Sequence, residues 1–210
     1  MSRAWKESND PEFWPKYRRR RRLYARRPKN GVRRCVDEFG PLNLQPRHGR
    51  HYARIRHVDR LRASYHRTGG VQHFLGLYDL ERDTLTGRFV WRKNWRTFLE
   101  FLKWVRGQYP MRRWLHVVLD NVGYHRKAEV QAYAASHRIK FYWTPTNASW
   151  LNRIECQFTA LQKFALDNTD HRTHQEQQQA LRHYWSWRNR RRGITLQPWT
   201  PSRHTTSFAA

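Results

Sequence analysis

The sequence predicts an α/β protein built on one mixed five-stranded sheet with helices on both faces. Three observations lead to this prediction. Strand-like apolar segments alternate with segments that carry the 3.6-residue period of helices. Early strands follow one another directly, as antiparallel strands do, and later strands are separated by helices, as in parallel crossovers. The 210 residues, 38% of them hydrophobic, suffice for one domain of ordinary size with short appendages.

The first thirty residues are predicted to form a basic N-terminal arm or a short helix. An unbroken run of arginines, Arg18, Arg19, Arg20, Arg21 and Arg22, lies within them. Like charges in a block repel one another unless an anion compensates them. An arm that follows a phosphate backbone is therefore one interpretation, and a solvated tail is the other.

The predicted core begins with a strand over 31–37, where apolar and polar residues alternate, and Gly40-Pro41 is expected to end it. Residues 42–69, rich in Arg, His and Gly, are expected to form a small β excursion or a loop that lies against DNA through Arg47 and Arg50. The next segments are a hairpin, a helix capped by Asn94, a buried strand, a helix and a strand. Their predicted ranges are 71–80 paired with 88–91, then 95–105, 115–119, 127–137 and 139–143.

The C-terminal part is predicted to hold two helices. Ser149 is a suitable N-cap for a long helix that runs to about Leu166, with an apolar stripe facing the core. A Gln-rich helix then runs towards Asn189, followed by an irregular tail. The chain is thus expected to divide into an arm (1–30), a core domain (31–168) and a C-terminal helix with its tail (169–210).

The charge of the chain indicates a polyanionic partner. Lys and Arg total 42 against 16 Asp and Glu, a formal net charge of +26. Such an excess suits a nucleic acid, whose counterions are released when its phosphates are neutralised. Binding to a membrane surface is the alternative interpretation of a basic chain. Separately, no apolar run approaches the length of a membrane-spanning helix. Two cysteines give no disulfide framework, which is consistent with a reducing cytoplasm.

Two acidic residues occupy positions typical of metal ligands. Asp120 ends the apolar run 115–119, at the strand end where α/β sheets place ligands. Glu155 follows 34 residues later, on the predicted helix, at the border of its apolar stripe. The spacing alone is weak, since about one such pair arises by chance. Capping of a turn by Asp120 and an ordinary surface position for Glu155 are the alternatives.

A third acid is expected from the first strand. Asp37 ends that strand before Gly40-Pro41, and Asp79 is its rival at the end of another strand. Glu38 is expected to point away from Asp37, because side chains alternate along a strand. Three carboxylates suit two Mg²⁺ ions, which can activate a nucleophile and stabilise the leaving oxygen of a phosphodiester.

The motifs that hold these acids resemble the DDE transposases of bacterial insertion sequences related to mariner. The resemblance covers roughly residues 10–190, and the separation of 34 residues between the second Asp and the Glu is characteristic of that branch. The matching segments are 36–41, Leu119-Asp120-Asn121 with His125, 144–146 leading into 149–155, and Trp187-Arg188-Asn189.

This resemblance implies an RNase H-like fold, two Mg²⁺ or Mn²⁺ ions, cleavage of DNA at element ends and strand transfer into target DNA. Asp37 would bridge the ions, Asp120 would hold one and Glu155 the other. Asn121, His125 and Asn152 match motif positions and would support these ligands or contact DNA.

The resemblance also implies a homodimer that holds two double-stranded element ends, in a bacterial cytoplasm and on the nucleoid. Relatives usually carry N-terminal helix-turn-helix domains, which the residues before the first strand are too few to form. The chain is therefore expected to be the catalytic part of a transposase. An RNase H-like nuclease without strand transfer and an inactive DNA-binding remnant are the alternatives.

Overall fold

The computed structural model describes residues 7–49 and 69–191. Within these ranges five strands form one sheet in the order β3-β2-β1-β4-β5. β1 pairs antiparallel with β2, as β2 does with β3, whereas β4 and β5 run parallel to β1. The predicted mixed five-stranded sheet is therefore confirmed. The strands are β1 (Gly31–Asn43), β2 (Val71–Asp79), β3 (Thr84–Val90), β4 (Trp114–Leu119) and β5 (Ile139–Trp143).

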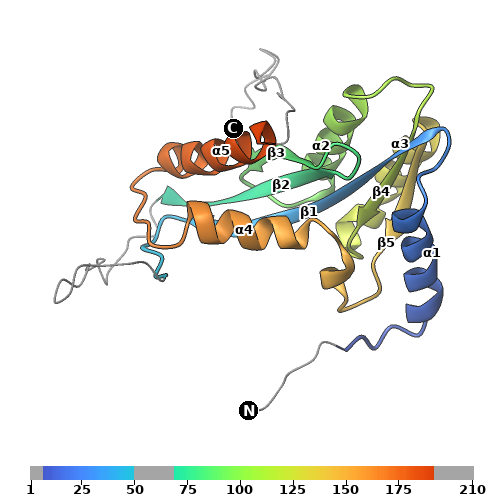
Figure 1. Cartoon of the computed structure of the whole chain (residues 1–210), viewed down its shortest axis with the longest axis horizontal. Helices are drawn as coiled ribbons and strands as arrows, with labels where there is room; N and C mark the ends of the chain where they lie inside the picture. The colour runs from blue at the N-terminus through green and yellow to red at the C-terminus, as the bar shows by residue number, and fades with distance from the viewer. Residues whose placement is uncertain (1–6, 50–68, 192–210) are drawn as a thin grey trace.

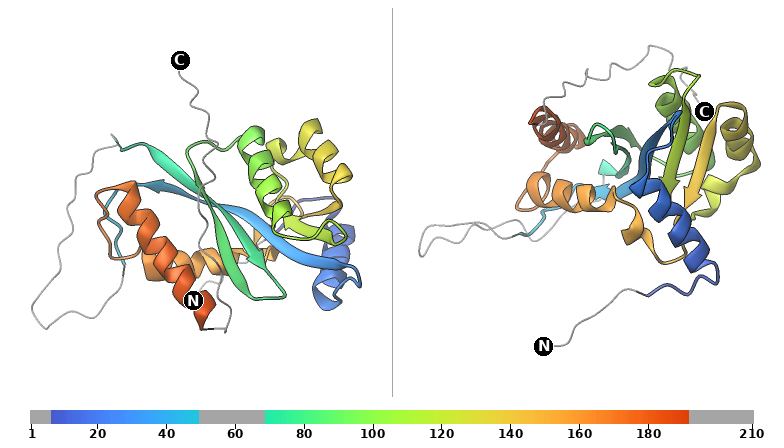
Figure 2. Two further views of the ribbon diagram at one scale, coloured as in Figure 1. Left: turned by 90° about the horizontal axis from the view of Figure 1, so that it is seen from above. Right: turned by 45° about the vertical axis from the view of Figure 1, so that its right-hand side comes forward.

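Helices cover both faces of this sheet, as Figures 1 and 2 show. On one face, α2 and α3 pack over apolar side chains such as Val36 and Val117. On the other face, α1, α4 and α5 pack over a second apolar cluster that contains Cys35 and Phe74. The helices are α1 (Phe13–Ala25), α2 (Trp95–Gly107), α3 (Ala128–Ser136), α4 (Glu155–Ala165) and α5 (His174–Arg190), with short 3₁₀ helices η2 (Gly123–Arg126) and η3 (Ser149–Leu151).

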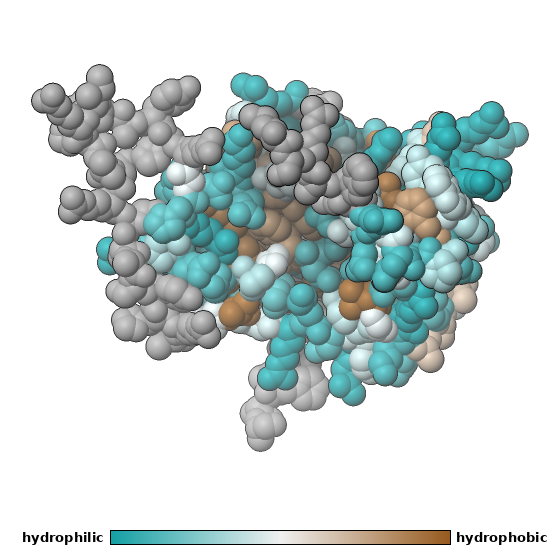
Figure 3. Space-filling view, turned by 90° about the horizontal axis from the view of Figure 1, so that it is seen from below, coloured by the Kyte–Doolittle hydropathy of each residue, from teal (hydrophilic) through white to brown (hydrophobic). Residues whose placement is uncertain are grey.

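The surface is mostly hydrophilic, as the composition requires. Figure 3 shows one face on which hydrophilic side chains predominate and hydrophobic ones lie between them. No helix in the described ranges combines the length and the apolar character that crossing a bilayer needs.

The first strand is longer than the sequence predicts. β1 continues past Gly40-Pro41 to Asn43, so the expectation that this dipeptide ends the strand is wrong. The pairing of β1 with β2 shifts register between Phe39 and Leu42. Pro41 has no N–H to donate, and a local irregularity of this kind accommodates a proline inside a strand. The hairpin turn is also shorter than predicted, because β3 begins at Thr84.

The long helix predicted from Ser149 is wrong in its first turns. Residues 149–151 form η3, Asn152 has extended backbone angles, and α4 begins only at Glu155. The side-chain amide of Asn152 is buried and donates to the carbonyl of Val36 on β1. This hydrogen bond holds Asn152 against β1 in an extended conformation, so the helix cannot begin at Ser149. Glu155 therefore opens α4 and does not lie one turn inside it.

The arginine run lies in α1, which is fixed to the loop between β5 and α4 from both of its ends. Before the helix, the carboxylate of Asp10 accepts hydrogen bonds from the backbone N–H of Thr146 and from Lys16, at 2.8 Å each. Near its C-terminal end, the Tyr24 hydroxyl donates to the carbonyl of Leu151 at 3.2 Å. The segment therefore has one defined orientation on the core.

Candidate metal centre

Asp37 and Asp120 meet because of the register of two parallel strands. β1 and β4 pair with Cys35 opposite Val118, and each Asp lies two residues beyond this pair. Side chains two residues apart point to the same face of a sheet. The carboxylates of Asp37 and Asp120 come within 4.8 Å of each other, together with that of Glu38.

Glu155 reaches the same region because α4 begins very close to β2. Gly76 pairs with Asp37 across β1 and β2. A Cβ at Gly76 would lie 2.7 Å from the ring of Phe158 and 3.0 Å from Ile154. Only a glycine leaves room for the first turn of α4 at this point on the sheet. Glu155, the first residue of α4, is close enough for its charge to act on Asp37.

The carboxyl group of Asp37 is strongly perturbed by its surroundings. Its side chain is buried, with 7% of the residue exposed. Burial, and then the negative charges of Asp120, Glu155 and Glu38, raise the pKa of Asp37 to about 8. A buried carboxyl among other carboxylates is stable as an anion only beside a cation, and the site therefore favours a metal ion over an empty cluster.

The prediction that Glu38 points away from the other acids is wrong. Its carboxylate accepts from Nε2 of His125 at 2.9 Å, while Nδ1 of the same ring lies 3.0 Å from Oδ1 of Asp120. Burial alone would lower the pKa of His125, but the hydrogen bonds and charges of Asp120 and Glu38 raise it to about 9. The fully buried imidazole thus links the two carboxylates and orients Asp120.

Two asparagines complete the surroundings of the acids. Nδ2 of Asn152 donates to Oδ2 of Asp37 at 3.2 Å and to the carbonyl of Val36 at 2.9 Å. Both partners are acceptors, which fixes the orientation of the amide. Among the described residues, Oδ1 of Asn152 and Oδ1 of Asn121 are buried without a hydrogen-bond partner. Unpaired oxygens beside carboxylates suit the water ligands that Mg²⁺ retains in proteins.

The acids offer only oxygen ligands, which fits Mg²⁺ or Mn²⁺, because both are hard cations.

Asp79, the rival third acid, lies in a different place. Its carboxylate pairs with the buried guanidinium of Arg34 at 2.7 Å, and its other oxygen accepts from the backbone of Glu81 and Arg82. Asp79 therefore stabilises the β2–β3 turn and is not part of the metal cluster.

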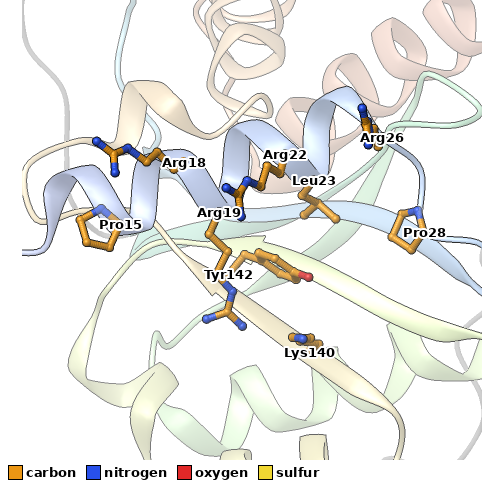
Figure 4. A pocket seen from close by; sticks show the side chains of 9 residues that line it. All are labelled: Pro15, Arg18, Arg19, Arg22, Leu23, Arg26, Pro28, Lys140 and Tyr142. Carbon is orange, nitrogen blue, oxygen red and sulfur yellow. The ribbon is translucent and has the colours of Figure 1, made fainter.

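Three of the arginines predicted to bind DNA line the same cavity. Arg18, Arg19 and Arg22 line a cavity of about 570 Å³ between α1 and β5, with Lys140 and Tyr142 on its other wall. Figure 4 shows these side chains, and the guanidinium of Arg19 lies 4.9 Å from the centre of the Tyr142 ring. This cavity is an open basic groove in which a phosphate backbone could lie.

The remaining predicted arginines behave differently. Arg20 is buried, and Arg21 is exposed beside it. Arg47 is half-buried and donates to the carbonyl of Pro41 and to Oδ1 of Asn43. Arg50 lies outside the described residues. A role in DNA binding stays a prediction for all of them.

Solved structures with the same fold are complexes of Mos1. The Mos1 mariner paired-end complex with Mn is 13% identical, with a TM-score of 0.66, covering 90% of this chain and 62% of that one. The Mos1 strand transfer complex is 13% identical, with a TM-score of 0.62 and coverages of 90% and 61%. The chain therefore spans a little over three fifths of the length of these proteins. A search of curated protein sequences finds no match.

These likenesses establish the class of the fold: it is the RNase H-like fold predicted from the sequence. The sequence also matches the DDE superfamily endonuclease family over residues 32–178, which is more than half of the chain. The chain belongs to the DDE superfamily endonuclease family.

Proposed function

We propose that this chain is the catalytic part of a transposase, which cuts DNA at the ends of a mobile element and joins those ends to target DNA. The observation that carries this proposal is the meeting of Asp37, from within β1, and Asp120, from the end of β4, with Glu155 at the start of α4 close enough for its charge to act on Asp37, in a member of this endonuclease family. The solved complexes with the same fold hold Mos1 with a transposon end or after strand transfer, which supports this reaction over simple hydrolysis.

The proposed ligands are Asp37 between two divalent ions, Asp120 on one ion and Glu155 on the other. Bound Mg²⁺ or Mn²⁺ would supply an activated nucleophile and would stabilise the leaving oxygen of a phosphodiester. The chain itself positions the ligands. Asn152 holds Asp37 by a hydrogen bond, and His125 fixes Asp120 against Glu38.

Double-stranded DNA is the proposed partner, both as element end and as target. The groove between α1 and β5, with Arg18, Arg19 and Arg22 on one wall and Lys140 on the other, provides a positive surface for its phosphates. We expect a homodimer that holds two ends, because joining both ends of one element requires two active sites. The proposed setting is the nucleoid in a bacterial cytoplasm.

The test is metal-dependent cleavage and joining of a DNA duplex by the purified chain and by Asp37→Asn, Asp120→Asn and Glu155→Gln. Each substitution should lower the rate about 1,000-fold or more, because metal-ion catalysis supplies several kcal/mol of transition-state stabilisation. Glu129→Gln is the matched control, since Glu129 is also a glutamate in the first turn of a helix but is exposed on α3. It should retain the full rate.

Three outcomes separate the proposal from its alternatives. Cleavage and joining that both disappear in the acidic variants support the transposase. Cleavage without joining, for a substrate with a free 3′ hydroxyl, would indicate a nuclease. DNA binding without metal-dependent cleavage by the unsubstituted chain would indicate a DNA-binding remnant.

A further inference from the structure

Arg20 is a buried cation without an anionic partner. It lies in the middle of α1, and only 2% of the residue is exposed. Within the described residues, neither Nη1 nor Nη2 has a hydrogen-bond partner. Burying a guanidinium is unfavourable unless an opposite charge and hydrogen bonds compensate it. The described residues therefore do not supply the negative charge and the hydrogen bonds that the Arg20 guanidinium requires.

The groups around Arg20 do not provide a counter-charge. Those near enough to affect its ionisation are Tyr24, Cys35 and Tyr17, none of which is a carboxylate. Burial raises the pKa of the Cys35 thiol to about 12 and holds the pKa of Tyr24 well above its usual range. Cys35 and Tyr24 are thus neutral at physiological pH. The surroundings can donate hydrogen bonds but cannot neutralise the arginine.

A cavity adjoins this side chain. Its volume is about 250 Å³, and its lining includes Arg20, Arg21 and Arg153 together with Tyr17 and Tyr24. Arg153 lies with its guanidinium 4.5 Å from the centre of the Tyr24 ring. Three arginines and the phenol of Tyr17 around one small space are donors of the kind expected around a phosphate.

The cavity is next to the segment that leads into the metal centre. Leu151 and Arg153 line it, and between them in the chain Asn152 donates to Asp37. Tyr24 holds this segment through two contacts. Its hydroxyl donates to the carbonyl of Leu151 and accepts from the backbone N–H of Arg153 at 3.4 Å. A ligand in the cavity would therefore contact the same short segment that orients a proposed metal ligand.

We infer that this cavity binds one phosphodiester of the DNA strand close to the reacting bond, with Arg20 as its buried cation and Arg21 and Arg153 closing over it. The inference rests on the proposed function, because it takes DNA as the substrate of the metal centre. It separates Arg20 from the arginines of the groove between α1 and β5. Those arginines face an open surface, whereas Arg20 would hold one particular phosphate.

The experiment measures the affinity of the whole chain, without divalent metal, for DNA duplexes that each carry a single methylphosphonate linkage. Such a linkage removes the charge of one phosphodiester. The unsubstituted chain should bind about 10- to 100-fold less tightly when the linkage falls at one particular position, as expected for a charge-assisted contact. Arg20→Met should bind the ordinary duplex with a similar loss and should not respond further at that position. For Arg20→Met, the slope of log K against log salt concentration should become less steep by about 0.9.

The matched control is Arg22→Met, an exposed arginine of the same helix. It should weaken binding overall but keep the response at the special linkage. Arg20→Met should melt no lower than the unsubstituted chain, because the charge it removes has no partner. If that variant does not fold, Arg20→Lys replaces it. Arg20→Lys keeps the charge without the fork of donors, and its response at the linkage should be smaller.

The inference is overturned if no linkage behaves differently between the unsubstituted chain and the Arg20 variant, or if the unsubstituted chain does not bind the duplex. Stabilisation by inorganic phosphate without any such linkage would indicate a site for a free anion and would overturn the assignment to DNA. Because the assay needs no cleavage, it can fail while metal-dependent cleavage persists, or succeed where cleavage is absent.

Discussion

Two clusters of charged side chains lie three residues apart on the same strand, β1, and they are built in opposite ways. In the first, the guanidinium of Arg34 lies 2.7 Å from Asp79 and 2.6 Å from Glu81, and Arg33 pairs with Glu81 at 2.8 Å. Each carboxylate of this first cluster forms a salt bridge with an arginine. In the second, Asp37 and Asp120 converge with other acids on one side of the strand, and His125 is their cationic neighbour.

The difference distinguishes buried charges that stabilise the fold from those that we propose to bind a cation. The paired cluster lowers the pKa of Glu81, despite burial, because Arg33 and Arg34 stabilise its anion. The acidic cluster raises the pKa of Asp37 to about 8, so its charge is disfavoured until a cation binds. A pKa that is shifted because a buried charge has no compensating partner is expected at functional sites.

Breaking the paired cluster should strongly lower the stability of the fold. Arg34→Met leaves Asp79 buried without its partner, and we expect a loss of about 3–5 kcal/mol in the free energy of unfolding. Urea unfolding followed by circular dichroism measures this loss. Arg82→Met, at an exposed position of the neighbouring turn, should change stability by no more than about 0.5 kcal/mol. Equal effects of the two substitutions would contradict a structural role for the pair.

A smaller effect is expected from the histidine of the acidic cluster. His125→Gln keeps a donor but cannot span both Glu38 and Asp120, so Asp120 loses its fixed orientation. The affinity for Mn²⁺ should fall about 10- to 100-fold, as for other residues that orient metal ligands. Isothermal titration calorimetry measures the change. Tighter binding of Mn²⁺ would show instead that the imidazolium acts as an internal counter-ion that the metal displaces.

The third expected effect is a dependence of stability on pH. The pKa of Asp37 rises from its ordinary 3.8 to about 8 on folding, so between these values the folded protein holds a proton that the unfolded chain releases. Without metal, this contribution to stability is complete below about pH 4 and is lost as pH rises towards 8. The stability of the unsubstituted chain relative to Asp37→Asn should therefore decline over that range and then level off. Urea unfolding in buffers from pH 5 to 9, with a chelator present, measures the decline. A pH-independent difference would mean that Asp37 is ionised in the folded chain.

Much of the sheet could be predicted because its strands carry local signals. Residues 139–143 form β5 as predicted, and Asn94 caps α2 by accepting from the N–H of Thr97. The start of α4 could not be predicted, because Ser149 is a good local N-cap. A tertiary contact, the amide of Asn152 with β1, overrides that signal. Local propensity predicts an element well only where packing agrees with it.

At the candidate site, the sequence predicts that Asp37 and Asp120 lie together but not that β1 continues beyond Asp37, nor how the acids are supported. The parallel register places Asp37 and Asp120 together, as their positions after apolar runs indicate. The link from Glu38 through His125 depends on residues 87 positions apart, and no local pattern shows it. Gly76 is a local signal for the placement of α4, since a glycine inside an apolar strand often marks a close approach.

The attachment of α1 would couple the proposed DNA binding to the arrangement of the proposed metal centre. Asp10 and Tyr24 fasten this helix to the loop that carries Asn152, near its two ends. A shift of α1 on binding a duplex would be transmitted through these two hydrogen bonds to Asn152, which donates a hydrogen bond to Asp37. If the proposed duplex binds α1, its position would then affect the loop that orients Asp37.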